Sequence, residues 1–364
     1  MNDISLFTPT SGVNLIIKTA GNACNINCKY CFEKAKEVAT KFIEPSFLDT
    51  LINTVEKTCT IVFHGGEPLI VGIEHFERML QIAEKYYPNK VTAIRIQTNG
   101  TLIDEKWIDL LYNKYKHLNI EIAISLDGIL EMNSLRTDYS NSNTFSRVLS
   151  SFELLNTHGI SAGMLSVISK RSLPYAKQYI EFINSIPNIK FVKINALFNI
   201  ENNQLSADSI TPFEYAKFIV EASKWYLSTK LYQKVAIEPF LSIIQRINNK
   251  KSRYCNYSSR KCFNYLSIYP DGSIGPCDCL SVNDFCIDDI SKSLDTNIIN
   301  TLNSSKCKDL FTLISSCDNC NIKDFCMGGC LSQRYYFMNN SELMSDFCYS
   351  KHYLYDTFKH FTLK

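Results

Sequence analysis

Three cysteines near the start of the sequence have a spacing that suits metal chemistry. Cys24, Cys28 and Cys31 lie within the stretch ACNINCKYCFEK. Three thiolates are one ligand short of the four that close a structural zinc site or an iron–sulfur cluster. The motif therefore indicates either a zinc knuckle with a distant fourth ligand or an iron–sulfur cubane whose fourth iron is left open.

A second field of cysteines follows in the C-terminal part of the chain. Its candidate ligands are Cys255, Cys262, Cys277, Cys317, Cys320, Cys326, Cys330 and Cys348. Their spacing alone permits zinc sites of four thiolates each. An iron–sulfur cluster with four protein ligands has no open position, so if these cysteines hold such clusters we expect them to store or pass electrons and not to bind a substrate.

The overall composition is that of a globular protein with an unusual number of cysteines. The chain has 364 residues, 15 cysteines and a formal net charge of +2. No block of like charge indicates nucleic acid or a membrane as a partner. We find no signal peptide and no long apolar run, so we expect a cytoplasmic protein, in which clustered cysteines bind metal more often than they form disulfides.

Short apolar runs alternate with helical periodicity over residues 13–235. The runs are residues 13–18, 60–65, 93–98, 121–126, 163–168 and 190–195. This alternation predicts an α/β fold, a partial (β/α)6 barrel, with its chemistry at the carboxyl ends of the strands. The cysteine motif and residues 64–68, 97–100 and 125–128 follow the first four runs, so we expect them to meet there.

Beyond the barrel, the pattern predicts helices over 212–230 and 239–248. The stretch YLSIYPDGSIGPCD then predicts a hairpin that turns at Asp271-Gly272. We therefore expect a barrel over residues 12–235, a bridging region over 236–254, a small cysteine-rich domain over 255–350 and a C-terminal helix over 351–364.

The three-cysteine motif, with Tyr30 and Phe32 beside Cys31, resembles that of the radical S-adenosylmethionine (SAM) enzymes. HGGEP (64–68) resembles the glycine-rich motif of that family, and QTNG and SLDG recur at the matching strand ends. The resemblance implies a [4Fe-4S] cluster whose open iron binds SAM, and a 5′-deoxyadenosyl radical that takes a hydrogen atom from carbon.

The same resemblance implies a set of cofactor-binding residues. They are Tyr30, Gly65, Gly66, Glu67, Asn99, Ser125, Arg136 and Leu197. Taken as single residues, Ser125 also fits a strand-end cap, Arg136 a surface position and Leu197 the core.

The later cysteines resemble the C-terminal extension called SPASM, which in its full form holds two auxiliary [4Fe-4S] clusters. The resemblance implies three clusters in all, with interleaved auxiliary ligands. The inner cluster would take Cys255, Cys262, Cys277 and Cys330, and the outer cluster Cys317, Cys320, Cys326 and Cys348. Cys59, Cys279, Cys286 and Cys307 are left over, and Cys279 competes with Cys277 as a ligand.

SPASM-bearing enzymes mostly act on peptides or proteins. The resemblance therefore implies an oxidoreductase with a precursor peptide or protein as substrate and a reducing flavodoxin or ferredoxin as partner. Since no leader-recognising domain precedes Cys24, we expect any leader peptide to be bound by the barrel, the SPASM region or a separate protein.

Two reactions compete. Peptide maturases form carbon–carbon or thioether cross-links in ribosomally made peptides, whereas anaerobic sulfatase maturases oxidise Cys or Ser to formylglycine. Asp278 matches the aspartate proposed as the base in the sulfatase maturases, although a turn cap would explain it as well. The GPCDC stretch and the basic residues 249–261 do not resemble that group, so we favour cross-linking and keep formylglycine formation as the alternative.

An electron carrier with several clusters and a zinc scaffold are the non-catalytic alternatives. Neither one explains why HGGEP, QTNG and SLDG follow successive predicted strands.

Overall fold

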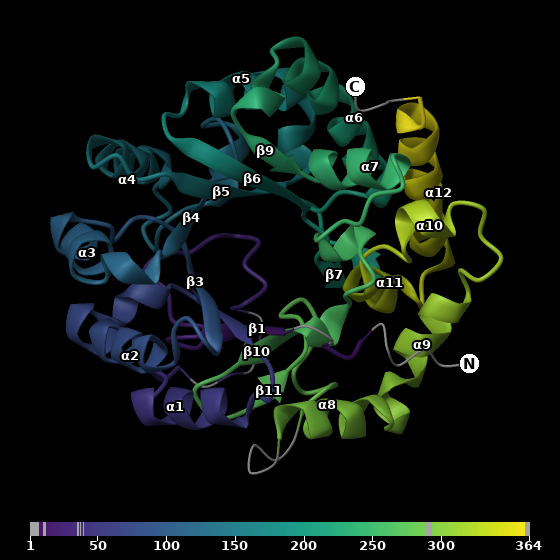
Figure 1. Ribbon diagram of the computed structural model, residues 1–364. Helices are drawn as coiled ribbons and strands as arrows, with labels where there is room; N and C mark the ends of the chain where they lie inside the picture. The colour runs from purple at the N-terminus through teal and green to yellow at the C-terminus, as the bar shows by residue number, and fades with distance from the viewer. Residues whose placement is uncertain are drawn as a thin grey trace.

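The computed structural model describes residues 7–9, 12–34, 36, 38, 40–287 and 293–360. In this part of the chain one sheet has the strand order β11-β10-β1-β2-β3-β4-β5-β6-β9. Its strands are β1 (Val13–Lys18), β2 (Cys59–His64), β3 (Val91–Thr98), β4 (Glu121–Ser125), β5 (Ala162–Ile168), β6 (Ile189–Ala196), β9 (Ala236–Glu238), β10 (Tyr265–Ile268) and β11 (Ile274–Gly275). Neighbouring strands are parallel except for β10 and β11, and the sheet curves around a central opening (Figure 1).

All six predicted strands are present, within one or two residues of their expected bounds. Their residues alternate between two environments. In β1, Leu15 and Ile17 are fully buried, whereas Asn14 and Ile16 are half-buried on the other face, which lines the opening. This architecture is the predicted α/β partial barrel.

Helices cover the outer side of the curved sheet (Figure 1). They are α1 (Pro45–Thr54), α2 (Ile73–Tyr86), α3 (Glu105–Ile108), α4 (Phe145–Thr157), α5 (Ala176–Ser185), α6 (Pro212–Ser228) and α7 (Phe240–Ile247). The helices predicted over 212–230 and 239–248 are α6 and α7. A short hairpin of β7 (Ile200–Glu201) and β8 (Gln204–Leu205) lies between β6 and α6.

The C-terminal segment extends the barrel sheet. β10 pairs in parallel with β1, so that Leu266 lies opposite Leu15 and Ile268 opposite Ile17. The predicted hairpin connects β10 to β11, and Gly272 in its turn has a φ of 90°, which favours glycine. The two cysteine-bearing parts of the chain therefore share one sheet.

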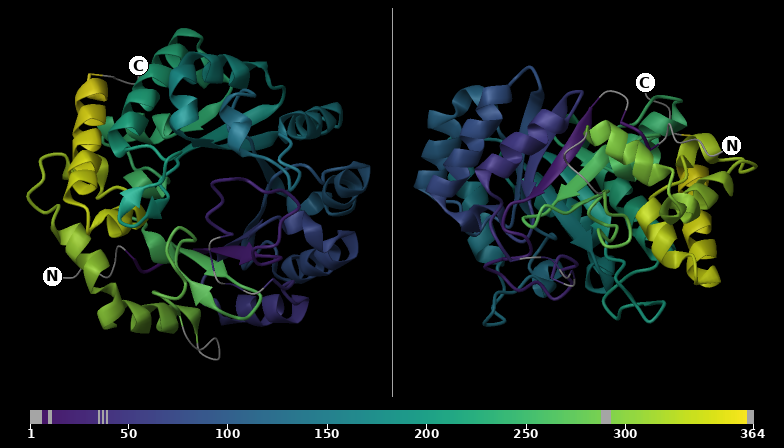
Figure 2. Two further views of the ribbon diagram at one scale, coloured as in Figure 1. Left: turned by 180° about the vertical axis from the view of Figure 1, so that it is seen from behind. Right: turned by 90° about the horizontal axis from the view of Figure 1, so that it is seen from below.

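Five helices complete the chain and lie beside the barrel (Figure 2). They are α8 (Leu294–Leu302), α9 (Lys308–Ser315), α10 (Lys323–Cys326), α11 (Leu331–Phe337) and α12 (Ser341–Phe358). The helix predicted over 351–364 begins earlier, at Ser341, because the Asn340 side chain caps it by accepting a hydrogen bond from Leu343 N at 3.0 Å. Residues 361–364 lie outside the described residues.

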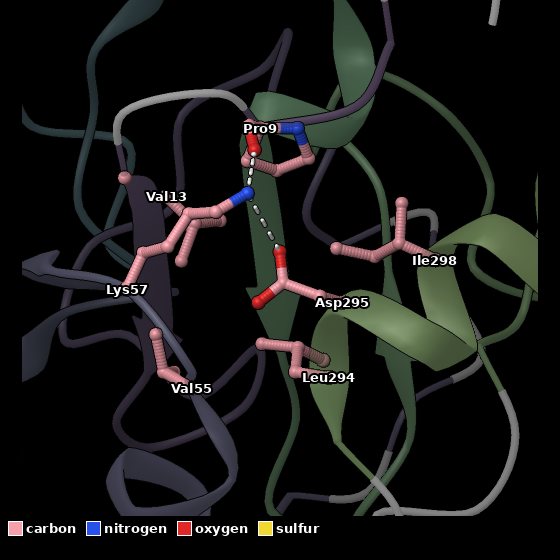
Figure 3. Close-up of a pocket in the computed structure, with 8 residues that line it drawn as sticks. Pro9, Val13, Val55, Lys57, Leu294, Asp295 and Ile298 are labelled. Atoms are coloured by element: carbon pink, nitrogen blue, oxygen red, sulfur yellow. Dashed lines mark hydrogen bonds and ion pairs between the residues drawn. The ribbon is translucent and has the colours of Figure 1, made fainter. Parts of the chain in front are cut away.

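Lys57, near the amino ends of the strands, connects this end of the sheet to α8. Lys57 Nζ donates a hydrogen bond to Pro9 O at 2.8 Å and lies 3.8 Å from Asp295 of α8 (Figure 3). The small pocket beside this contact includes Val13, the first residue of β1, and so lies at the end opposite Lys18. Among the described helices, none combines the length and apolar composition that crossing a membrane requires.

The pairing of β10 with β1 leads to a stability prediction. Leu266 is fully buried, so Leu266→Ala should lower the free energy of unfolding by about 2–5 kcal/mol. Leu241→Ala is the control, because Leu241 is 40% exposed. Thermal unfolding of the anaerobically purified proteins measures both. Equal melting temperatures for the two variants would contradict the structural role of β10.

Candidate functional site

The three-cysteine loop lies at the carboxyl end of β1 and is held there by backbone contacts. Gly66 N donates to Gly21 O, and Glu67 N donates to Ala23 O, each at 2.9 Å. A Cβ atom on Gly66 would lie only 2.0 Å from Ala23 O. The close approach that requires a glycine here is therefore between the HGGEP motif and the cysteine loop.

Glu67 ties HGGEP to the QTNG motif. Its carboxylate accepts hydrogen bonds from Thr98 Oγ1 and Asn99 N, both at 2.7 Å, and from Leu69 N at 3.1 Å. Burial raises its pKa to about 7. Asn99 in turn places its Nδ2 at 3.6 Å from Cys24 Sγ, so both motifs support the cysteine loop.

A buried arginine lies beside the same loop. Arg136 is 6% exposed, and its Nη1 donates to the Tyr30 hydroxyl at 3.0 Å. The Tyr30 hydroxyl donates to Asp127 Oδ2 at 2.7 Å. Arg136 Nε is buried and has no hydrogen-bond partner among the described residues. From the sequence alone, Arg136 also fitted a surface position. In the structure it is a buried donor, and its Nε–H group has no partner among the described residues.

The remaining expected cofactor contacts lie at neighbouring strand ends. The Ser125 hydroxyl, at the end of β4, accepts a hydrogen bond from Gln97 Nε2 at 2.9 Å. Leu197 follows β6 directly and is 4% exposed. The structure therefore gathers the expected residues at the carboxyl end of the barrel, where β1 to β6 end.

The donor set fits a thiolate-bound metal group together with an anionic ligand. Burial raises the pKa of Cys24 to about 11 and also raises the pKa of Cys28. Without metal these thiols hold their protons at neutral pH, so binding of a cluster must release them. The free N–H group of Arg136 beside them suits a carboxylate.

The two ligand sets expected from the sequence, the inner and outer cysteine groups, can be compared with the sulfur atoms that affect the pKa of each cysteine. Burial raises the pKa of Cys262, and the charges of Cys330 and Cys255 add to this shift. A hydrogen bond with Cys279, followed by burial, raises the pKa of Cys277, and the charge of Cys262 makes a smaller contribution. Cys348 interacts in the same way with Cys317 and Cys320, and Cys326 with Cys317. Cys326 is thus affected by Cys317 of the expected outer group, and Cys330 acts on Cys262 of the expected inner group.

A glycine turn separates these two cysteines. Met327, Gly328 and Gly329 all have positive φ, at 53°, 78° and 65°. The turn ends α10 after Cys326 and begins α11 after Cys330. The turn therefore lies between one cysteine of the expected outer group and one of the expected inner group.

Asp278 belongs to an ion-pair network that the sequence analysis missed. Lys18 is 0% exposed, and its Nζ lies 2.5 Å from Glu33 Oε1 and 3.0 Å from Asp278 Oδ2. Lys36 Nζ contacts the same Glu33 oxygen at 2.8 Å and Asp278 O at 2.7 Å. Although burial opposes it, the charge of Lys18, with smaller contributions from His64 and Lys36, holds the pKa of Asp278 well below its usual range.

His64 completes the network. It is the residue opposite Lys18 in the β1–β2 register, and its Nδ1 accepts from Gly65 N at 2.7 Å and lies 3.3 Å from Lys18 Nζ. Burial and the Lys18 charge lower its pKa to about 4, so the ring is neutral at neutral pH. A lysine at the last position of an apolar strand, VNLIIK, was the signal that could have revealed this network.

The leftover cysteines have different surroundings. Cys59 begins β2 and is 1% exposed, as expected for a small apolar side chain. The ligand atoms of Cys277, Asp278 and Cys279 all lie within 4.8 Å of one another. Cys279 therefore does lie beside the inner group.

Comparisons with known proteins agree with this arrangement. Residues 19–182 match the model of the radical SAM superfamily. The chain is 28% identical over 333 residues to the cysteine-type anaerobic sulfatase-maturating enzyme of Clostridium perfringens strain 13, covering 87% of this chain and 88% of that protein. It is 24% identical to the serine-type enzyme of Klebsiella aerogenes, covering 87% of this chain and 79% of the relative.

Solved structures show the same fold. Native anSMEcpe with bound AdoMet and Cp18Cys peptide superimposes with a TM-score of 0.81 at 24% identity, covering 95% of this chain and 96% of that one. SuiB from Streptococcus suis superimposes with a TM-score of 0.60 at 18% identity, covering 88% of this chain and 73% of that one. Residues 19–182 therefore match a radical SAM domain, and the chain is similar over most of its length to anaerobic sulfatase-maturating enzymes.

Proposed function

We propose that this enzyme oxidises the Cβ atom of a Cys or Ser residue in a protein substrate to formylglycine. The sequence alone favoured cross-linking of a ribosomally made peptide. The relatives that match most of the chain are sulfatase-maturating enzymes, and SuiB, which has been solved with the precursor peptide SuiA, is less similar in structure. The comparisons thus support the alternative better than the reaction that we first favoured.

The two ion pairs of Lys18 are the main structural support for this proposal. Lys18 joins Glu33, two residues after Cys31, to Asp278, the residue after Cys277. A carboxylate is thereby held between the three-cysteine loop and the inner cysteine group, on the face of β1 and β2 that lines the opening. This is where a base would have to lie if a substrate carbon is activated on one side and oxidised on the other.

In this proposal the residues of the chain have separate roles in proton transfer and in SAM binding. When bound, SAM and the clusters supply the radical and the one-electron transfers. Asp278 accepts the proton of the substrate's thiol or hydroxyl group, and Lys18 keeps that carboxylate ionised and oriented. Tyr30, Gly65, Gly66, Glu67, Asn99, Ser125, Arg136 and Leu197 form the SAM site, with the free N–H of Arg136 available to the SAM carboxylate.

The metal sites follow the two groups of cysteines. Cys24, Cys28 and Cys31 hold the cluster that binds SAM. Two auxiliary [4Fe-4S] clusters take the ligand sets expected from the sequence, Cys255, Cys262, Cys277 and Cys330 for the inner cluster and Cys317, Cys320, Cys326 and Cys348 for the outer one. A flavodoxin or ferredoxin supplies the electron that begins each cycle.

The mass of the product distinguishes formylglycine formation from cross-linking. Mass spectrometry of Cys-containing peptides after anaerobic incubation with SAM and reductant should show that sulfur is replaced by oxygen with loss of two hydrogens. Loss of two hydrogens with the sulfur retained would identify a cross-link and overturn the proposal.

The first cluster can be tested separately from the reaction. Replacing Cys24, Cys28 and Cys31 with alanine should abolish release of 5′-deoxyadenosine from SAM, because no thiolate remains to hold the iron. Cys317→Ala is the matched control and should retain uncoupled SAM cleavage. Cleavage by the triple variant would show that the cluster is held elsewhere.

The role of Asp278 predicts a split between two activities. Asp278→Asn should lower formation of modified peptide by about 10²–10⁴-fold, as expected for loss of a general base, while SAM cleavage continues. Lys18→Met should act in the same direction, because Asp278 loses its orienting partner. Product formation at the native rate by Asp278→Asn, measured by mass spectrometry, would exclude this residue as the base.

A further inference from the structure

Among the described residues of the C-terminal segment, three cations are buried without acidic partners. Lys261, Arg334 and Lys351 are 2%, 3% and 7% exposed. Within the described part of the chain, none of them has a carboxylate at ion-pair distance. The buried Lys18, by contrast, contacts two carboxylates. Burial of an unpaired charge costs several kcal/mol, and an arginine cannot avoid this cost by losing its proton.

The contacts of two of these cations converge on the glycine turn between the cysteine groups. Lys261 Nζ donates to Cys255 O at 2.8 Å and to Gly329 O at 2.9 Å. Arg334 Nη1 donates to Gly328 O at 3.2 Å and lies 3.2 Å from Cys317 Sγ. Backbone carbonyls orient the two cations, but they do not neutralise them.

Lys351 lies on α12, which packs beside α11 (Figure 1). Its Nζ lies over two aromatic rings, at 5.1 Å from the centroid of Tyr257 and 5.2 Å from that of Phe347. Burial lowers the pKa of Lys351, and the charges of nearby sulfur atoms oppose this shift: those of Cys326 and Cys348 of the outer group, and those of Cys330 and Cys255 of the inner group. Lys261 likewise interacts with Cys326 and with inner cysteines.

The cysteines themselves are the only candidates among these contacts to carry the missing negative charge. A cubane bound by four thiolates is an anion, and it becomes more negative when it is reduced. A fixed positive charge beside it therefore stabilises the reduced state and raises the reduction potential.

We propose that Lys351, together with Lys261, is a shared counter-ion that raises the reduction potentials of both auxiliary clusters, whereas Arg334 acts on the outer cluster alone. This inference rests on the two auxiliary clusters of the proposed function. Lys261 contacts the carbonyl groups of Cys255 and Gly329, and sulfur atoms of both groups act on Lys351, so the two lysines make both clusters better electron acceptors.

The test is an anaerobic redox titration monitored by electron paramagnetic resonance. Lys351→Met should lower the midpoint potentials of both auxiliary clusters by at least about 59 mV. For a one-electron couple, this shift lowers the ratio of reduced to oxidised cluster tenfold at a fixed potential. Lys359→Met is the control, because Lys359 follows α12, is 40% exposed and pairs with Asp356. It should leave both potentials unchanged.

Two further variants separate a charge effect from a structural one. Lys351→Arg keeps the charge and should restore both potentials, and Arg334→Gln should lower the potential of the outer cluster only. Native-like potentials in Lys351→Met with native iron content, or potentials that Lys351→Arg fails to restore, would overturn the proposal. If the native protein itself holds fewer than three cubanes by iron and sulfide analysis, the cluster assignment fails first, independently of the lysines.

Discussion

The parallel pairing of β10 with β1 is the constraint on which the rest of the site depends. It extends the barrel sheet by a strand that is distant in sequence, and the hairpin that follows leads directly to Cys277 and Asp278. Because β1 itself leads into the three-cysteine loop, its pairing with β10 brings both cysteine regions to the same opening. Lys18 at the end of β1 then connects them through Glu33 and Asp278.

Buried charge is used in two different ways in this protein. At Lys18 the charge is compensated by carboxylates of the chain itself, so that network exists without any metal. At Lys261, Arg334 and Lys351 no acidic partner is present among the described residues, and the surrounding sulfur atoms must become anionic. With the proposed clusters, folding of the C-terminal segment and cluster loading would be coupled, because ligands and buried cations are each unfavourable without the metal group.

In the proposed function one cluster is open and two are closed, and the residues present fit this division. The three-cysteine loop is fixed by backbone hydrogen bonds from HGGEP and offers no fourth thiol, but it has the free N–H group of Arg136 nearby. The later groups have four cysteines each. An open iron binds a cofactor, whereas a closed cluster can only exchange electrons, and Asp278 lies on the inner side between the two types of site.

The sequence by itself determined the barrel strands and the sets of cysteines. Short β-branched runs gave the strand positions within one or two residues, since a buried parallel strand needs such residues throughout. Ligand spacing and motif order identified the radical SAM domain. The sequence did not reveal the partners of Lys18, nor that Arg136, Lys261, Arg334 and Lys351 are buried. A single charged residue carries no periodic signal, and whether its charge is compensated depends on chain segments that only the tertiary structure brings together.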